Sequence, residues 1–114
     1  MCASPPKLIF SCSGAADVGA IADQAARKLT REVKGKMFCT VGIGGKVSGI
    51  LETNKSASKI LAIDGCSLNC TKIALSKPDL RISHADIGIA KGKTLPSKEN
   101  INNVAEKCTE LLEC

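Results

Sequence analysis

Short apolar segments alternate with segments of helical periodicity along this chain, and this alternation constrains its fold more than any other feature. KLIFSC, at residues 7–12, and ILAI, at residues 60–63, have the length and aliphatic content of buried strands. Two further strands are predicted at about residues 37–41 and 81–85. Because ILAI is apolar at every position, both of its faces must be covered, as in the centre of a parallel sheet.

Helices are predicted between these strands and after the last of them. The clearest case is residues 17–33, where apolar residues recur at helical spacing and Asp17 is the expected N-cap. Shorter helices are expected at residues 47–53 and 67–77, and a last helix follows its cap, Ser97. Strands that alternate with helices favour a parallel sheet with helices on both faces. The sequence therefore predicts an α/β fold: a three-layer αβα sandwich with a mainly parallel four-stranded sheet, of the Rossmann-like or flavodoxin-like type.

The size and composition of the chain narrow its class. A chain of 114 residues has the size of one domain, so residues 1–114 are expected to fold as a single domain. Its formal net charge of +5 is scattered and its aromatic content is 2%, whereas a nucleic-acid surface needs a dense basic stripe with stacking rings. The first residues lack the pattern of a signal peptide, and no apolar run approaches the roughly 18 residues of a membrane helix. We therefore expect a cytoplasmic protein that binds neither nucleic acid nor membrane.

Seven cysteines are many for such a chain. In a reducing compartment they serve as metal ligands or catalytic thiols before they serve as disulfides. Cys108 falls on the apolar face of the last helix and is predicted to be a core residue. Cys2 and Cys114 lie at the chain ends, which commonly fray. The remaining four cysteines are the candidates for a site: Cys12, Cys39, Cys66 and Cys70.

In a parallel sheet these four residues are expected to converge. Cys12 and Cys39 fall at or near the ends of the first two predicted strands, and Cys66 closely follows the third. Ligands of such sheets bind outside the carboxyl ends of the strands. Cys66 is expected to open the third helix, where backbone N–H groups favour a thiolate, and Cys70, four residues on, faces the same way. Four thiolates at one point form a tetrahedral Zn²⁺ site, although the spacing is not that of a zinc ribbon.

Thiol chemistry is the alternative to metal binding. A thiol-dependent redox enzyme or a metal-assisted enzyme would use Cys12 or the Cys66/Cys70 pair. Oxyanion chemistry of the Cys-x₅-Arg type is disfavoured, because Val18 and Lys72 stand where that motif needs an arginine. Four cysteines can also hold an iron–sulfur cluster.

Other polar and glycine positions have ordinary structural interpretations. GIGG, at residues 42–45, fits no phosphate-binding motif and is predicted to be a mobile turn. Asp64 is expected to be a turn or capping acceptor, with a second role in orienting a metal site. His84 is expected to be a structural histidine, Asp86 a carboxylate at a strand end, and Lys72 an exposed lysine that could offset thiolate charge.

Three motifs resemble, in order, those of the DGC family, which is named for its Asp-Gly-Cys triplet. They are SCSGAADVG at residues 11–19, CTVGIGG at residues 39–45 and IDGCSLNC at residues 63–70, and the similarity covers about residues 7–90. The resemblance implies zinc binding and no particular reaction. A site with four protein ligands is closed to substrate, so we expect a structural, sensing or metal-holding role more than an enzyme. The ligands that the family pattern implies are again Cys12, Cys39, Cys66 and Cys70.

Overall fold

The fold is described here from a computed structural model. The structure describes residues 7–12, 16–65, 68–75, 79–83, 86, 88, 89, 92 and 96–112 of the 114-residue chain. Its elements in chain order are β1 (Lys7–Ser11), α1 (Asp17–Arg31), β2 (Lys36–Met37), α2 (Thr40–Gly44), α3 (Ser48–Lys55), β3 (Lys59–Ile63), α4 (Cys70–Leu75), β4 (Leu80–Ile82) and α6 (Lys98–Leu112).

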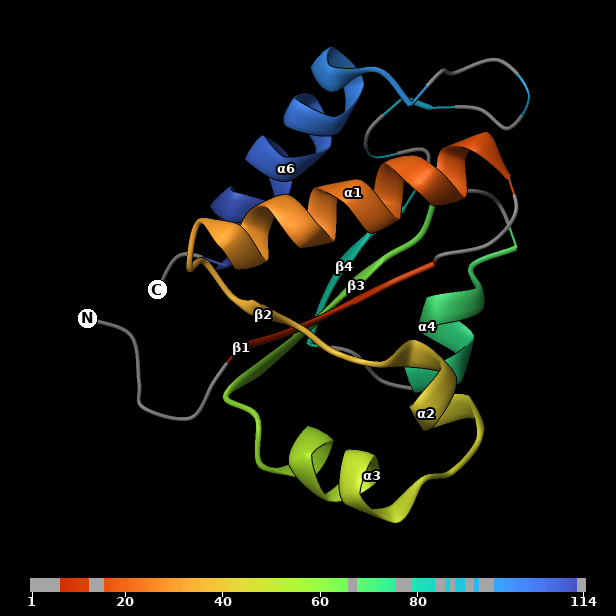
Figure 1. The fold of residues 1–114 in the computed structure, drawn as a ribbon, viewed down its shortest axis with the longest axis vertical. Coiled ribbons are helices and arrows are strands. Elements are labelled where there is room, and N and C mark those ends of the chain that lie inside the picture. The colour runs from red at the N-terminus through yellow and green to blue at the C-terminus, as the bar shows by residue number, and fades with distance from the viewer. Residues whose placement is uncertain are drawn as a thin grey trace.

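The four strands form one parallel sheet in the order β2-β1-β3-β4 (Figure 1). β1 and β3 pair over five positions at the centre, with Phe10 opposite Ala62. The two edge strands are shorter than predicted, at two and three residues. The sheet confirms the predicted parallel α/β architecture.

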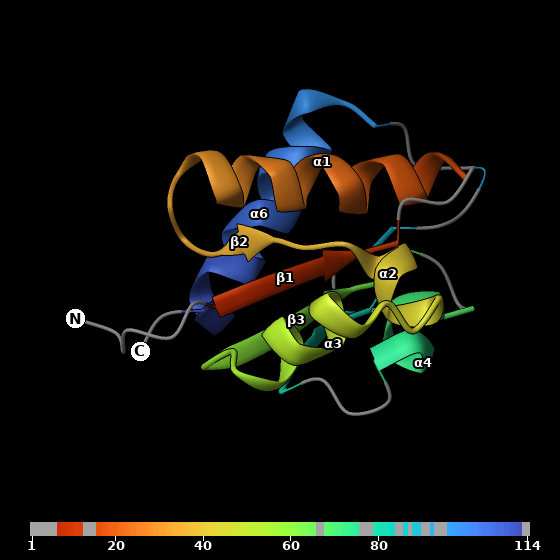
Figure 2. The ribbon, with the colours of Figure 1, turned by 60° about the horizontal axis from the view of Figure 1, so that its bottom comes forward.

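Helices cover both faces of this sheet (Figure 1, Figure 2). Because side chains alternate along a strand, Ile9 and its sheet neighbours Leu61 and Ile63 point to the side of α1 and α6 and form one buried cluster with them. Leu8 and Phe10 point to the other side and pack under α2, α3 and α4. The result is the predicted three-layer arrangement, with a larger core on the α1/α6 side.

The helix at α1 forms as its periodicity predicts, but its start differs. Ala16 occupies the N-cap position, so the prediction of Asp17 as N-cap is wrong. The Asp17 carboxylate instead accepts hydrogen bonds from Val18 N at 2.9 Å and Gly92 N at 3.0 Å. Asp17 thereby ties a segment 75 residues away to the first turn of α1. No helix in the described part of the chain is long and apolar enough to cross a membrane.

The segment after β2 is the largest departure from the prediction. Residues 40–44 form the short helix α2 and not the end of a strand or a mobile turn. A Cβ on Gly42 would lie 2.2 Å from Ile50 Cδ1, so this glycine allows α2 to pack closely on α3. Ile43 is buried beside Leu8 and Phe10. Tertiary packing therefore overrides the weak helix propensity of glycine.

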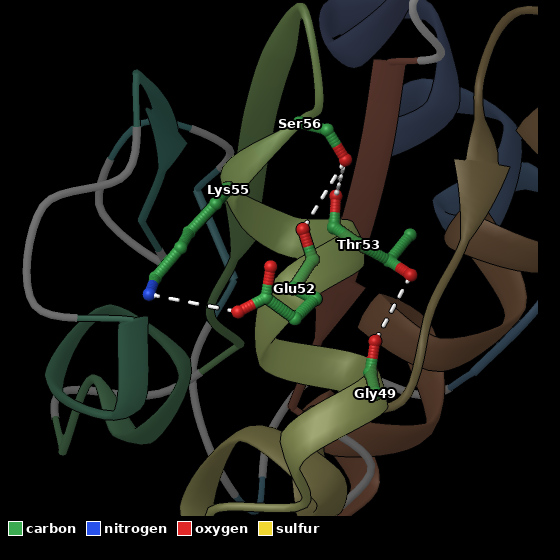
Figure 3. A network of polar contacts seen from close by, with 5 residues as sticks. All are labelled: Gly49, Glu52, Thr53, Lys55 and Ser56. Atoms are coloured by element: carbon green, nitrogen blue, oxygen red, sulfur yellow. Dashed lines mark hydrogen bonds and ion pairs between the residues drawn. The ribbon is translucent and has the colours of Figure 1, made fainter.

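α3 agrees with the prediction of a short helix, and its end is held by hydroxyl groups (Figure 3). Ser56 Oγ donates to the carbonyls of Glu52 and Thr53, at 3.2 and 3.1 Å, and Thr53 Oγ1 donates to Gly49 O at 3.0 Å. The carbonyls of Glu52 and Thr53 also accept the backbone N–H of Ser56, so the hydroxyl groups add to the hydrogen bonds at the end of the helix. Ile50 and Leu51 pack inward, as predicted.

α6 confirms the predicted last helix and its core cysteine. Ser97 Oγ accepts a hydrogen bond from Asn100 N at 3.2 Å, as an N-cap does. Cys108 is fully buried against α1 and the sheet. Burial raises the pKa of its thiol to about 12, because a thiolate is poorly solvated in an apolar core.

The raised pKa of Cys108 predicts a pH-dependent stability. The folded state keeps the thiol proton above the ordinary pKa of 9.0. The contribution of the protonated Cys108 thiol to the free energy of unfolding is therefore complete below pH 9 and is lost as the pH rises toward 12. From pH 9 to pH 11 the free energy of unfolding of the wild type should fall more steeply than that of Cys108→Ala. The difference should reach up to about 1.4 kcal/mol per pH unit. Urea unfolding at the two pH values measures this difference; equal slopes for the two proteins would contradict the assignment.

Candidate functional site

Three of the four candidate cysteines lie at the carboxyl edge of the sheet, as predicted. Cys12 directly follows β1, and its backbone N–H donates to Ile63 O at the end of β3, at 3.0 Å. Cys39 follows β2 and precedes α2, while Cys70 is the first residue of α4. α2 and α4 are in contact at this edge (Figure 1, Figure 2). Cys66 lies outside the described residues.

A hydrogen bond links the segments that carry Cys12 and Cys39. Thr40 Oγ1 donates to Ser11 O at 3.1 Å, so the first residue of α2 is fixed against the last residue of β1. Each of these two residues is a direct neighbour of one of the cysteines. No local sequence pattern predicts this contact, because the bonded residues are 29 positions apart.

The thiol of Cys39 takes part in capping α2. Cys39 is the N-cap residue, and its Sγ accepts a hydrogen bond from Gly42 N at 3.3 Å. Cys39 and Cys70 are both exposed free thiols, whereas Cys12 is half-buried. Two of the three described sulfurs are therefore accessible to solvent at this edge.

Asp64 holds α4 in place. Its carboxylate is almost completely buried, with 1% exposure, and accepts hydrogen bonds from Thr71 N at 2.8 Å and Lys72 N at 3.1 Å. Its own N–H donates to Ile82 O at 3.0 Å. The prediction of a capping acceptor is confirmed: a carboxylate fixed to the sheet satisfies two orphan donors of the first turn of α4. The position of Cys70 therefore depends on Asp64.

Gly65 is required by a close contact between β3 and α1. A Cβ on Gly65 would lie 2.3 Å from Val18 O, which is a backbone atom that cannot rotate away. The Asp-Gly pair thus has two structural roles: Asp64 fixes α4, and Gly65 lets the chain pass against α1. Sequence reasoning missed this role of Gly65, although the glycine stands in the recognised motif.

The helix that carries Cys70 begins later than predicted. Leu68 and Asn69 are not helical, and Asn69 has a φ of +54°, a left-handed conformation that asparagine tolerates. Cys70 and not Cys66 therefore opens the helix, so the predicted i, i+4 arrangement on one helix face is wrong. The N-terminus of α4, which begins at Cys70, therefore gives no support for a thiolate at Cys66.

Two other polar residues singled out in the sequence, Asp86 and Lys72, lie in the described part of the chain. Asp86 Oδ2 accepts from Ser83 N at 2.8 Å and Ser83 Oγ at 2.9 Å, in a turn after β4. Lys72 is exposed, as predicted, and His84 lies outside the described residues. Within the described part of the chain, no three His, Cys, Asp or Glu side chains lie close enough to hold one metal ion. The thiols suit a soft metal by their chemistry, but the described residues alone do not make a closed ligand set.

The class of the protein is thus a small α/β fold with cysteines at the carboxyl edge of a parallel sheet. The family model for the DGC domain matches residues 8–108, and the chain therefore belongs to this family. It is also similar to the anaerobic and virulence modulator AnvM of Pseudomonas aeruginosa, with 34% identity over 91 residues that cover 76% of this chain and 70% of that protein. No solved structure matches the chain significantly.

The role of Asp64 can be tested by removing its carboxylate. Asp64→Ala should lower the free energy of unfolding by about 2 kcal/mol or more, because two buried amide donors lose their acceptor. Hydrogen exchange at the Thr71 and Lys72 amides should accelerate. Asp79→Ala is the matched control, since exposed Asp79 also accepts from one backbone amide, that of Ile60 at 2.9 Å. A faster α4 exchange in both variants, or in neither, would contradict the assignment.

The close contact at Gly65 makes a separate prediction. Gly65→Ala should lower the free energy of unfolding by about 1–3 kcal/mol, because its methyl group overlaps the backbone of α1. Gly49→Ala is the control, since a Cβ there meets no atom within 4 Å and alanine favours the helix by up to about 1 kcal/mol. Urea denaturation followed by circular dichroism compares the two. Similar stabilities would show that α1 can shift to accept the methyl group.

Proposed function

We propose that this protein binds one Zn²⁺ ion through the thiolates of Cys12, Cys39, Cys66 and Cys70, and that it acts as a metal-holding or sensing protein. The observation that supports the proposal is the meeting of Cys12, Cys39 and Cys70 at one sheet edge from three separate strand connections. Two of these thiols are exposed and free to bind. Zn²⁺ would supply strong thiolate bonding that joins these connections.

The residues around the edge would place the thiols and would not react themselves. The Thr40–Ser11 hydrogen bond sets Cys12 and Cys39 relative to each other. Asp64 sets the first turn of α4 and hence Cys70. The segments that carry Cys12, Cys39 and Cys70 are thus held at the sheet edge by these hydrogen bonds. Four protein ligands leave no open position for a substrate, which favours holding or sensing over hydrolysis.

A regulatory role is consistent with the relative named as a modulator. For this chain we infer only that a sensing role would depend on whether the zinc site is occupied. The competing hypothesis is a thiol-dependent or metal-assisted enzyme that uses Cys12 or the Cys66/Cys70 pair, in which one thiol stays reactive.

Metal analysis with single substitutions tests the proposal. Purified protein should hold one zinc per chain with four protected thiols, and Cys39→Ser should weaken zinc binding more than about 100-fold, because loss of a ligand exceeds the 10- to 100-fold effect of losing its hydrogen-bond partner. Cys108→Ser is the matched control and should leave the affinity unchanged, since Cys108 is buried in the core. Competition with a chromophoric chelator measures the affinities.

Other outcomes decide between the alternatives. Substoichiometric metal with one fast-reacting thiol would support the enzyme hypothesis and contradict the closed site. Strong visible absorption of the purified protein would indicate an iron–sulfur cluster in place of zinc. Equal loss of affinity in Cys39→Ser and Cys108→Ser would contradict the ligand set.

A further inference from the structure

An open groove of about 620 Å³ is lined by residues of the C-terminal half of α1, of the edge strand β2 and of the segment that follows β2. Its volume is within the range of small-molecule sites. The groove combines apolar, cationic and thiol groups, which none of the roles derived above explains together. Its lining residues are Arg27, Thr30, Arg31, Met37, Phe38 and Cys39.

The walls of the groove are fixed by the fold. Met37 N donates to Thr30 Oγ1 at 2.9 Å, which joins β2 to α1. Phe38 N donates to Ile9 O at 2.9 Å, and the Phe38 ring packs edge-on against Phe10 with centroids 6.1 Å apart. The apolar surface of the groove is therefore already ordered before a ligand binds. This lowers the entropic cost of binding.

The charge in the groove has one sign. Arg27 and Arg31 are the charged residues among its lining residues, and at i, i+4 on α1 they are neighbours on one helix face. Arg27 uses its Nε for Asp23, at 2.8 Å, and its side chain is 56% exposed. Arg31 is exposed and forms no ion pair with the described residues. Two adjacent guanidinium groups favour a ligand with carboxylates, which they can bind in a bidentate geometry.

Cys39 adds a cysteine to the lining of the same groove. The residue is exposed, its thiol is not in a disulfide, and it lines the groove together with the two arginines. The guanidinium groups would bind carboxylates of a ligand, and Met37 and Phe38 would contact an aliphatic part of it. The Cys39 thiol would match a sulfur atom of the same ligand. This combination describes a small disulfide formed from carboxylate-bearing thiols.

We propose that this groove binds a low-molecular-weight disulfide carrying carboxylates, and that Cys39 undergoes thiol–disulfide exchange with it. The Cys39 thiol gives its proton to solvent, and its sulfur attacks one sulfur of the disulfide. A Cys39–S–S–R bond forms, the S–S bond of the disulfide breaks, and the second half leaves as a thiolate that takes up a proton. Cys39 is oxidised and half of the small disulfide is reduced. Regulation of the zinc site by this exchange rests on the proposed function, because the exchange removes Cys39 from the proposed zinc ligands.

The experiment compares disulfides of different charge on the metal-free full-length chain. Oxidised glutathione serves as the anionic probe, bis(2-hydroxyethyl) disulfide as the neutral probe and cystamine as the cationic one. Peptide mapping gives the modification rate of Cys39 relative to Cys70, the other exposed free thiol, in the same sample. The Cys39/Cys70 ratio should be about tenfold higher for the anionic than for the neutral probe at low salt. An equal ratio for all three probes would overturn the proposal.

Variants assign the effect to the groove. The double variant Arg27→Gln/Arg31→Gln should abolish the preference for the anionic probe and leave the rate with the neutral probe unchanged. Arg81→Gln, at an exposed arginine on β4 outside the groove, is the matched control and should keep the preference. Cys108 should stay unmodified, which shows that the chain is folded. A preference that survives the double variant would contradict the proposal.

Two further measurements keep this test separate from that of the zinc site. If zinc slows modification of Cys39, the proposed function and the exchange agree; if zinc has no effect while the charge preference persists, the zinc proposal fails and the groove remains. Should the metal-free chain unfold, S-methylglutathione, which cannot exchange, is titrated into the protein as purified. Chemical shifts of the Arg31 and Phe38 amides should then change in the wild type and not in the double variant, and no change in the wild type would overturn the proposal.

Discussion

The buried hydrogen bonds of the Asp64 carboxylate are the interaction on which the arrangement of the edge depends. A carboxylate with 1% exposure is stable in a fold only when donors surround it, and the Thr71 and Lys72 amides of α4 are those donors. The strand end and the helix start therefore stabilise each other. The adjacent Gly65 brings the same strand end against α1, so two neighbouring residues connect both helical layers to the centre of the sheet.

The parts of the fold that the sequence predicted are those with a local cause. β1 and β3 are buried on both faces, and that burial demands uninterrupted aliphatic residues which are visible in the sequence. α1 and α6 each carry a full apolar stripe, and Ser97 supplies its cap from the adjacent position. The carboxyl-edge position of Cys12 and Cys39 followed from parallel topology alone, because every strand then ends on the same side, whereas that of Cys70 depends on the Asp64 contacts to α4.

The parts that could not be predicted are decided by contacts between distant residues. Gly42 reads as a flexible residue in the sequence, but the Ile50 side chain against it makes it a packing position in α2. Asp64 selects the start of α4 by binding amides seven and eight residues ahead, and the left-handed Asn69 turns the chain between them. Asp17 similarly binds Gly92. Hydrophobic periodicity does not contain such contacts, so the predicted starts of α1 and α4 differ from the observed ones.

Cys39 connects the two proposals, because it belongs to the sheet edge and to the groove at once. The Cys39 sulfur in a mixed disulfide is not a thiolate and cannot act as a thiolate ligand of zinc. The zinc-bound state and the mixed-disulfide state therefore exclude each other. Each ligand then stabilises one state by mass action, and more of the disulfide raises the apparent dissociation constant for zinc. Arg27 and Arg31 lie outside the ligand set, so they can set the affinity for the disulfide without altering the thiolates. Under the two proposals, the position of one cysteine, one residue before α2, would couple redox state to metal occupancy.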